Sequence, residues 1–342
     1  MATTDEELAE LGEGVVWQEN RKPARGNARA ADQLIKMAVQ LMGSKPVSER
    51  ANAVRDHVVA LVKDHTQVMV KITGNSADMK GLMRSVEYIS RSGKYKKKGD
   101  AELELENEKG DFFRGPQGRE MLRKEWTLGG PSIPETATAS QSGAAADPKH
   151  APRQVLKIIY SMPAHVGREA VTAAAKAAIA ETFAGHQWVV AHHADTDNQH
   201  THLLVKMVDM NGKRMNPRKA DLDLWRKSFA KHLVARGVDA SATRRRVRLQ
   251  RTKGVSQAVR ELRARGVVPE RDKTAKTQAP ALHKALENED RMLSAYGAIA
   301  STLHNSQTQA DRELGQALEK SLQARGYALK INKPALQPQP GI

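Results

Sequence analysis

The sequence contains no cysteine, and this absence excludes disulfide bridges, cysteine–zinc sites and thiol chemistry. Aromatic residues are scarce, with 4 Phe, 4 Trp and 5 Tyr in 342 residues. No apolar run reaches the roughly 18 residues that a membrane-spanning helix needs, so we expect no membrane insertion. The first 13 residues carry five acidic side chains and no basic one, whereas a secretory signal peptide begins basic and continues apolar. We therefore expect a cytoplasmic protein.

Positive charge is abundant and unevenly distributed. There are 55 Lys and Arg against 39 Asp and Glu, which gives a formal net charge of +16 and a pI near 9.9. Residues 203–254 hold 15 basic side chains and 4 acidic ones. Such a block attracts phosphates and makes binding depend on salt, because neutralised phosphates release counterions. The pattern predicts a nucleic acid partner, with Arg244, Arg245 and Arg246 as phosphate ligands. The alternative is a solvated segment that never meets the partner, and in that case we expect the phosphate-binding face at Arg84, Arg91 and residues 94–98.

Hydrophobic periodicity and composition divide the chain into three segments. We expect a helical N-terminal extension at residues 1–66, a central domain at 67–251 and a helical C-terminal region at 252–342. Apolar runs and helical stripes interleave in the central segment, and two of the runs are joined by a polar turn, as in a hairpin. This arrangement predicts an α+β fold with an antiparallel central sheet and flanking helices. Residues 131–152, rich in Ala, Thr, Ser and Pro, predict a flexible insert.

Individual elements are expected from the same patterns. A cluster of turn-forming residues, Thr73–Ser76, is expected to end the first strand. The expected strands are Val68–Ile72, Val155–Ser161, Trp188–His193 and His200–Val208. The expected helices are Ala31–Met42, Val47–Lys63, Asp78–Ser90, Arg168–Ala184, Leu222–Arg236, Val255–Arg265, Ala281–Ser301 and Gln307–Arg325.

Four of the 12 histidines fall within residues 192–202. Side chains two positions apart on a strand point to the same face, so His200 and His202 project together. In a hairpin, one of the adjacent His192 and His193 faces them. We choose His193, and His192 is the alternative register. Three imidazoles with open positions for water or substrate suit a metal site.

A metal beside a basic surface suggests phosphodiester chemistry, which also needs a nucleophile and a proton acceptor. Asp195 and Asp197, in the turn between the histidine pairs, are candidates to orient the ligands or to act as the base. Tyr88 lies at the end of its expected helix and is followed by Arg91 and Lys94, which can bind phosphates. On its own, a helical tyrosine at such a position more often packs in a core, so its assignment depends on the surrounding motifs.

Taken together, these motifs resemble those of a known family. EYISRSGK, IIYSMP and HHADTDNQHTHLLV occur in this order over about residues 67–251, and the set is similar to that of the MOBP-type conjugative relaxases, relatives of the T-DNA border endonuclease. The resemblance implies the HUH-endonuclease relaxase fold, with Tyr88 as the nucleophile and Ser161 near the DNA backbone. It also implies that the three histidines, with His193, bind a divalent metal ion, Mg or Mn. The family tyrosine usually lies close to the N-terminus, which leaves the role of the N-terminal extension open.

The resemblance further implies an activity and its partners. A relaxase nicks one strand at a plasmid transfer origin by tyrosine transesterification, forms a covalent 5′-phosphotyrosine and rejoins the strand, in conjugative mobilisation. Single-stranded and supercoiled plasmid DNA, relaxosome accessory proteins, a coupling protein and a type IV secretion system are the implied partners. One alternative is a rolling-circle replication initiator, which usually places its tyrosine after the histidines. Another is a non-enzymatic DNA-binding accessory protein.

Overall fold

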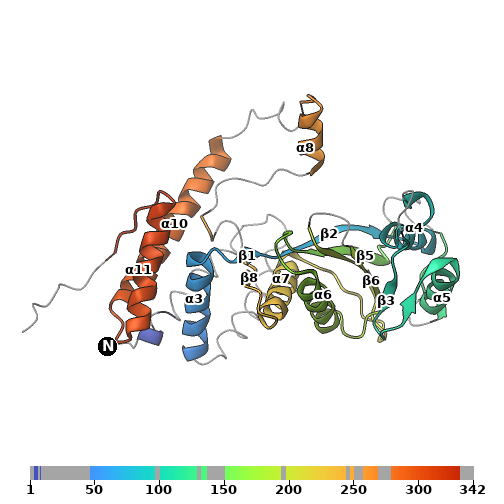
Figure 1. Ribbon diagram of the computed structural model, residues 1–342, viewed down its shortest axis with the longest axis horizontal. Coiled ribbons are helices and arrows are strands. Elements are labelled where there is room, and N and C mark those ends of the chain that lie inside the picture. Colours follow the sequence, from blue (N-terminus) through green and yellow to red (C-terminus); the bar gives the residue numbers. More distant parts are fainter. Residues whose placement is uncertain are drawn as a thin grey trace, which may run out of the picture. The chain divides into compact units, whose positions relative to one another are not determined.

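The chain divides into two compact units. The computed structural model describes residues 4–6, 8, 47–96, 101–128, 132–136, 151–193, 198–243, 247–249, 257–268 and 279–331. One unit, Thr66–Ala242, holds the strands, and the other combines Met1–His65 with Thr243–Ile342 (Figure 1). The expected helix Ala31–Met42 and most of the expected insert at 131–152 lie outside the described residues.

Six strands form an antiparallel sheet in the order β2-β5-β7-β6-β3-β4. The three strands at its centre, β5, β7 and β6, are the most apolar runs of the chain, and nearly all their residues are buried. A short parallel pair, β1 and β8, forms a second sheet. The strands span β1 (Thr66–Gln67), β2 (Met69–Ser76), β3 (Leu105–Asn107), β4 (Phe112–Phe113), β5 (Val155–Ser161), β6 (Trp188–His193), β7 (His200–Lys206) and β8 (Ala240–Ser241).

Helices cover both faces of this sheet. On one face α6 and α7 enclose a core that includes Ile158 and Val205, and on the other α4 and α5 enclose a core that includes Val189 and Leu204. The central strands β5, β6 and β7 contribute to both cores because successive side chains point to opposite faces. The expected α+β fold with an antiparallel central sheet is confirmed. The helices span α4 (Met79–Ile89), α5 (Gly115–Leu128), α6 (Arg168–Thr182) and α7 (Lys219–Val234).

The prediction that Thr73–Ser76 ends the first strand is wrong. Strand β2 continues through these residues, which pair with the start of β5 after a register shift between Ile72 and Gly74. The irregularity absorbs the turn-forming sequence, and pairing with a buried neighbour outweighs the local preference. Its consequence is that the polar side chains of this stretch lie on the sheet instead of in a loop.

Helix α5 is not among the elements that the sequence patterns predict. It begins at Gly115-Pro116, where proline suits the first turn of a helix. Gly118 in the same turn weakens the intrinsic helix preference, but a Cβ there would lie 2.9 Å from the backbone carbon of Phe113. Glycine thus allows the helix to pack closely on strand β4, and the buried Trp126 anchors its far end.

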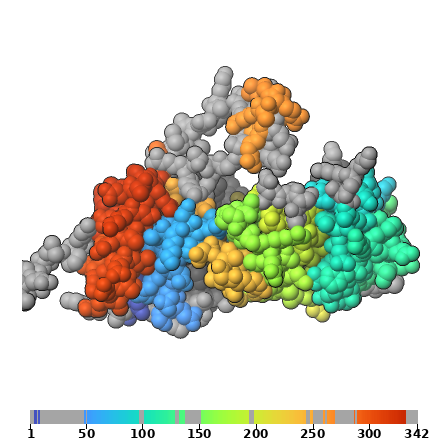
Figure 2. Space-filling view, viewed as in Figure 1, coloured from blue at the N-terminus to red at the C-terminus, as the bar shows by residue number. Residues whose placement is uncertain are grey.

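The helical unit is built from both ends of the chain. Val58 of α3 and Tyr296 of α10 belong to one buried core with residues of α11. Arg55 of α3 forms an ion pair of 2.8 Å with Asp311 of α11, and Figure 2 shows the blue α3 beside the red C-terminal helices. The helices of this unit span α3 (Val47–Val62), α8 (Gln257–Ala264), α10 (Ala279–His304) and α11 (Gln309–Ala324). Among the described residues, no helix is both long and apolar enough to cross a membrane.

Candidate active site

Three histidines meet on the sheet face that α4 covers, at the end of the β6–β7 hairpin. His193 pairs with His200 across the two strands, and His202 lies two residues further along β7 on the same face. One ring nitrogen from each lies within 4.8 Å of the others. His192 points to the opposite face, where its Nδ1 lies 2.8 Å from the Thr201 hydroxyl. The structure thus places His193, and not His192, with the other two.

In two of the three histidines, a backbone carbonyl holds one ring nitrogen. His193 Nε2 donates to the carbonyl oxygen of Ile89 at 2.7 Å, and His200 Nδ1 donates to that of Asn198 at 3.0 Å. Because a carbonyl can only accept, these bonds fix the tautomer and leave Nδ1 of His193 and Nε2 of His200 as acceptors. This outer arrangement is typical of metal-binding histidines. The donor set therefore fits a divalent metal ion, which the cluster could hold.

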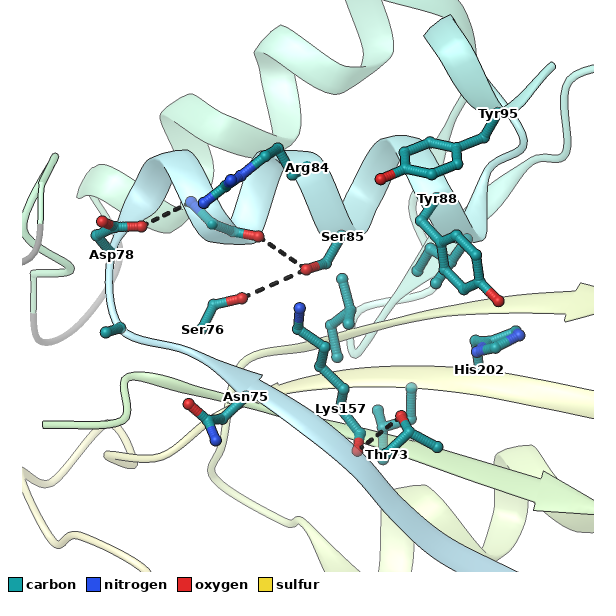
Figure 3. Close-up of a pocket in the computed structure, with 15 residues that line it drawn as sticks. Thr73, Asn75, Ser76, Asp78, Arg84, Ser85, Tyr88, Tyr95, Lys157 and His202 are labelled. Atoms are coloured by element: carbon teal, nitrogen blue, oxygen red, sulfur yellow. Dashed lines mark hydrogen bonds between the residues drawn. The ribbon is translucent and has the colours of Figure 1, made fainter. Parts of the chain in front are cut away.

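Tyr88 lies beside this cluster, on the last turn of α4. The apolar stripe of α4 faces the sheet, with Leu82, Val86 and Ile89 buried, whereas Tyr88 is 51% exposed. Its ring centroid lies 5.6 Å from that of His202, edge to face. Figure 3 shows the Tyr88 hydroxyl directed toward His202. The common alternative for a helical tyrosine, core packing, does not apply to this one.

The end of α4 brings Arg91 to the histidines. The Ser92 amide donates to Glu87 and the Arg91 amide to Tyr88, so the helix ends in a motif whose left-handed residue is usually glycine. Here that residue is Arg91, with φ of 54°. Its guanidinium donates to Nδ1 of His193 at 3.1 Å, so a metal ion bound at that nitrogen would replace this hydrogen bond. A strained backbone position therefore puts a cation within the cluster.

The remaining predicted residues are distributed unevenly around the site. Lys94 is exposed on the short η1 (Gly93–Tyr95), and its Nζ lies 5.2 Å from the centre of the Tyr95 ring. Ser161 pairs with His200 across the sheet and is 5% exposed, so it lies next to the cluster but is largely covered. Five predicted site residues lie outside the described part of the chain: Asp195, Asp197, Arg244, Arg245 and Arg246.

A cavity of about 500 Å³ adjoins Tyr88 and His202, between α4 and strands β2, β5 and β7 (Figure 3). Two basic residues line it, Lys157 and Arg84. Sequence reasoning named Arg84 as part of the alternative phosphate-binding face, but it missed Lys157 as a binding residue of the site. The sequence positions of both carry a signal. Lys157 lies four residues before Ser161 on the same strand face, and Arg84 lies four residues before Tyr88 on the same helix.

A known protein family matches part of the chain. Residues 122–237, about a third of the chain, match the family described as relaxase, MobA/VirD2-like, nuclease domain. The matched region contains Ser161 and the three clustered histidines, and it begins after Tyr88. No curated protein sequence matches the chain.

Proposed function

We propose that the protein nicks one strand of plasmid DNA at a transfer origin and becomes linked to the cut strand through Tyr88, because residues 122–237 match the nuclease domain of the MobA/VirD2-like relaxases. This match supports DNA nicking as the activity of the nuclease domain. One observation carries the choice of nucleophile: the exposed ring of Tyr88 lies 5.6 Å from the ring of His202, next to the three-histidine cluster. We propose residues 67–251 as the nuclease domain.

The proposed step is an exchange of one phosphodiester for another. The Tyr88 phenolic oxygen bonds to the scissile phosphorus, and the bond from phosphorus to the 3′ oxygen breaks. The phenol loses its proton to a base, for which Asp195 and Asp197 are the proposed residues, and the departing 3′ oxygen takes up a proton. The product is a 5′-phosphotyrosine with a free 3′ hydroxyl. Because the ester retains the bond energy, the reverse attack rejoins the strand without ATP.

His193, His200 and His202 would hold a divalent metal ion, with Mg or Mn as the proposed ions. Such an ion, when bound, neutralises charge that develops on the scissile phosphate. The carbonyls of Ile89 and Asn198 keep the acceptor nitrogens of two of these histidines turned away from the backbone.

Several basic and polar residues are proposed to hold the DNA. Arg91 lies within the histidine cluster, and its planar fork suits a phosphate oxygen. Lys94 offers a second positive charge near Tyr95. Ser161, which pairs with His200 across the sheet, offers a hydroxyl. The Arg244–Arg246 run is proposed to bind phosphates further along the DNA, with a sequence-independent contribution to affinity.

Conjugative mobilisation is the proposed biological setting. It requires relaxosome accessory proteins, a coupling protein and a type IV secretion system as partners, and it starts in the cytoplasm of the donor cell. A rolling-circle replication initiator would share the metal and tyrosine chemistry, but Tyr88 precedes the histidines here, which favours the relaxase. A non-enzymatic DNA-binding protein would need neither the histidine cluster nor an exposed tyrosine beside it.

Nicking of supercoiled DNA tests the proposal. The substrate is a plasmid carrying the cognate transfer origin, taken from the DNA next to the gene, and the control is the same plasmid without the origin. We expect the purified protein with Mg or Mn to convert the first plasmid to the open circular form after denaturation with detergent. EDTA and the Tyr88→Phe substitution should each abolish the conversion. Conversion of both plasmids alike, or none with any divalent ion, would contradict the proposal.

A further inference from the structure

Two basic side chains from different elements line the cavity that adjoins Tyr88. Lys157 extends from β5, and Arg84 lies on α4, one turn before Tyr88. Both line the cavity that also reaches Tyr88, Tyr95 and His202. Figure 3 shows the Lys157 side chain extending from the strand toward the helix that carries Arg84. The two charges thus approach the same space from the sheet and from the helix.

The charges of Lys157 and Arg84 are not balanced by acidic side chains in the described part of the chain. Among the residues that the structure describes, neither Lys157 nor Arg84 has an ion pair with a carboxylate. The cavity's described lining includes one acid, Asp78, and its Oδ1 accepts from the amide of Gly81 at 2.6 Å as the cap of α4. Burial, followed by repulsion from Arg84, lowers the pKa of Lys157. An anion in this space would favour the charged form of Lys157 and so oppose the effects of burial and of Arg84 on its pKa.

We propose that Lys157 and Arg84 bind a second DNA phosphate, the one next to the phosphodiester that Tyr88 cleaves. This inference rests on the proposed function, because it takes single-stranded DNA as the occupant of the cavity. A strand whose scissile phosphate lies at Tyr88 carries its neighbouring phosphate one nucleotide away. The cavity extends from Tyr88 and His202 along α4 to these two cations.

The remaining walls of the cavity agree with a nucleotide as the occupant. The Tyr95 ring stands edge to face against Tyr88, with 5.3 Å between the ring centres, and offers an aromatic surface for a base. Ser76 and Asn75 of β2 and Ser85 of α4 add small polar groups to the lining. Lys157 and Arg84 would act as positioning residues. By fixing the neighbouring phosphate, they would hold the scissile phosphorus in line with the Tyr88 oxygen.

The test measures binding to single-stranded origin DNA by the full-length Tyr88→Phe protein, which retains the ring but cannot attack. Each oligonucleotide carries one uncharged methylphosphonate at a different linkage near the nick. We expect one such linkage to weaken binding of the parent protein and to have no further effect in Lys157→Ala or Arg84→Ala. Each substitution should also lower the magnitude of the log–log salt slope by about 0.7.

Two further variants separate loss of charge from loss of structure. Lys157→Arg should retain both the salt slope and the sensitivity to the methylphosphonate. Lys124→Ala, which removes an exposed lysine of α5 outside the cavity, should behave as the parent. If Lys157→Ala and Arg84→Ala keep the parent's slope and its sensitivity at every linkage, the second phosphate site is wrong.

Cleavage of the unmodified oligonucleotide by the wild-type protein is scored separately. Cleavage without any coupling between these cations and a linkage overturns the phosphate site and leaves the proposed function intact. Coupling at one linkage without cleavage supports the phosphate site and overturns the nuclease function.

Discussion

Lys206 carries its amine into the interior of the sheet unit, where 2% of the residue is exposed. Its Nζ donates to the side-chain oxygen of Gln187 at 2.7 Å and to the carbonyl of Trp126 at 3.2 Å. Burial lowers its pKa from 10.5 to about 8, and Glu108 offsets part of this effect. The lysine ties β7 to the end of α5, at the cost of a desolvated charge.

The lowered pKa of Lys206 gives the protein a specific dependence on pH. The native state releases this proton near pH 8, whereas the unfolded chain holds it until about 10.5. Since the unfolded state then binds more protons, this group adds stability as the pH rises between the two values. From pH 7.5 to 9.5 we expect wild type to gain about 2 kcal/mol relative to Lys206→Met. Urea unfolding at both pH values measures this difference, and a constant gap would contradict it.

The histidine cluster depends on which of two adjacent residues faces it. His193 pairs with His200 on the side of α4, and His192 lies on the side of α6. We expect His193→Ala, His200→Ala and His202→Ala each to weaken Mn binding by at least tenfold, whereas His192→Ala stays close to wild type. Titration calorimetry with the metal alone measures this. Equal losses in His192→Ala and His193→Ala would show that the assigned register is wrong.

At the scale of elements, sequence patterns predicted the bounds of the central strands β5 and β6 correctly, but they missed features at the edges of the sheet. Val155–Ser161 and Trp188–His193 have the predicted bounds, because their apolar runs are buried on both faces. The extension of β2 through Gly74 and the presence of α5 depend on pairing and close packing, which single-sequence patterns do not contain. The histidine cluster followed from alternation and a hairpin. The role of Lys157 could not be predicted, because a single lysine on a strand does not indicate a binding site unless the cavity that it lines is known.

The C-terminus of α4 links backbone strain to the site. Arg91 occupies a left-handed position that costs an L residue about 1–2 kcal/mol and suits glycine. We expect Arg91→Gly to unfold at a higher denaturant concentration than Arg91→Ala, since both lose the guanidinium but only one retains the strained Cβ. Both should nick at least tenfold more slowly than wild type, because a charge-assisted phosphate contact is lost. Wild-type nicking rates in Arg91→Gly would contradict a role for this cation in the site.

At the scale of the whole molecule, the two ends of the chain share one core. Leu8 and Val58 are buried with Ile299 and Leu318 of the C-terminal helices. The sequence separates an N-terminal region, 1–66, from a C-terminal region, 252–342. Apart from Thr66, both fall within one compact unit, which comprises Met1–His65 and Thr243–Ile342. Sequence patterns cannot pair helices so distant along the chain, because amphipathic stripes do not identify their partners.

The net charge of +16 predicts strongly salt-dependent DNA binding. Replacing Arg244, Arg245 and Arg246 by alanine should weaken binding to all sequences alike. If all three contact phosphates of single-stranded DNA, the magnitude of the log–log salt slope should fall by about 2. Binding isotherms at several salt concentrations measure the slope. An unchanged slope with unchanged affinity would mean that the run is a solvated segment that does not contact DNA.

The account as a whole depends on the residue that becomes joined to DNA. The most direct measurement incubates the wild-type protein with a single-stranded origin oligonucleotide and a divalent ion, digests the adduct that survives detergent, and identifies the DNA-linked peptide by mass spectrometry. We predict a nucleotide linked by its 5′ phosphate to Tyr88, and no adduct from Tyr88→Phe. A link to Tyr95 or another residue, or an adduct of equal yield from Tyr88→Phe, would contradict the account.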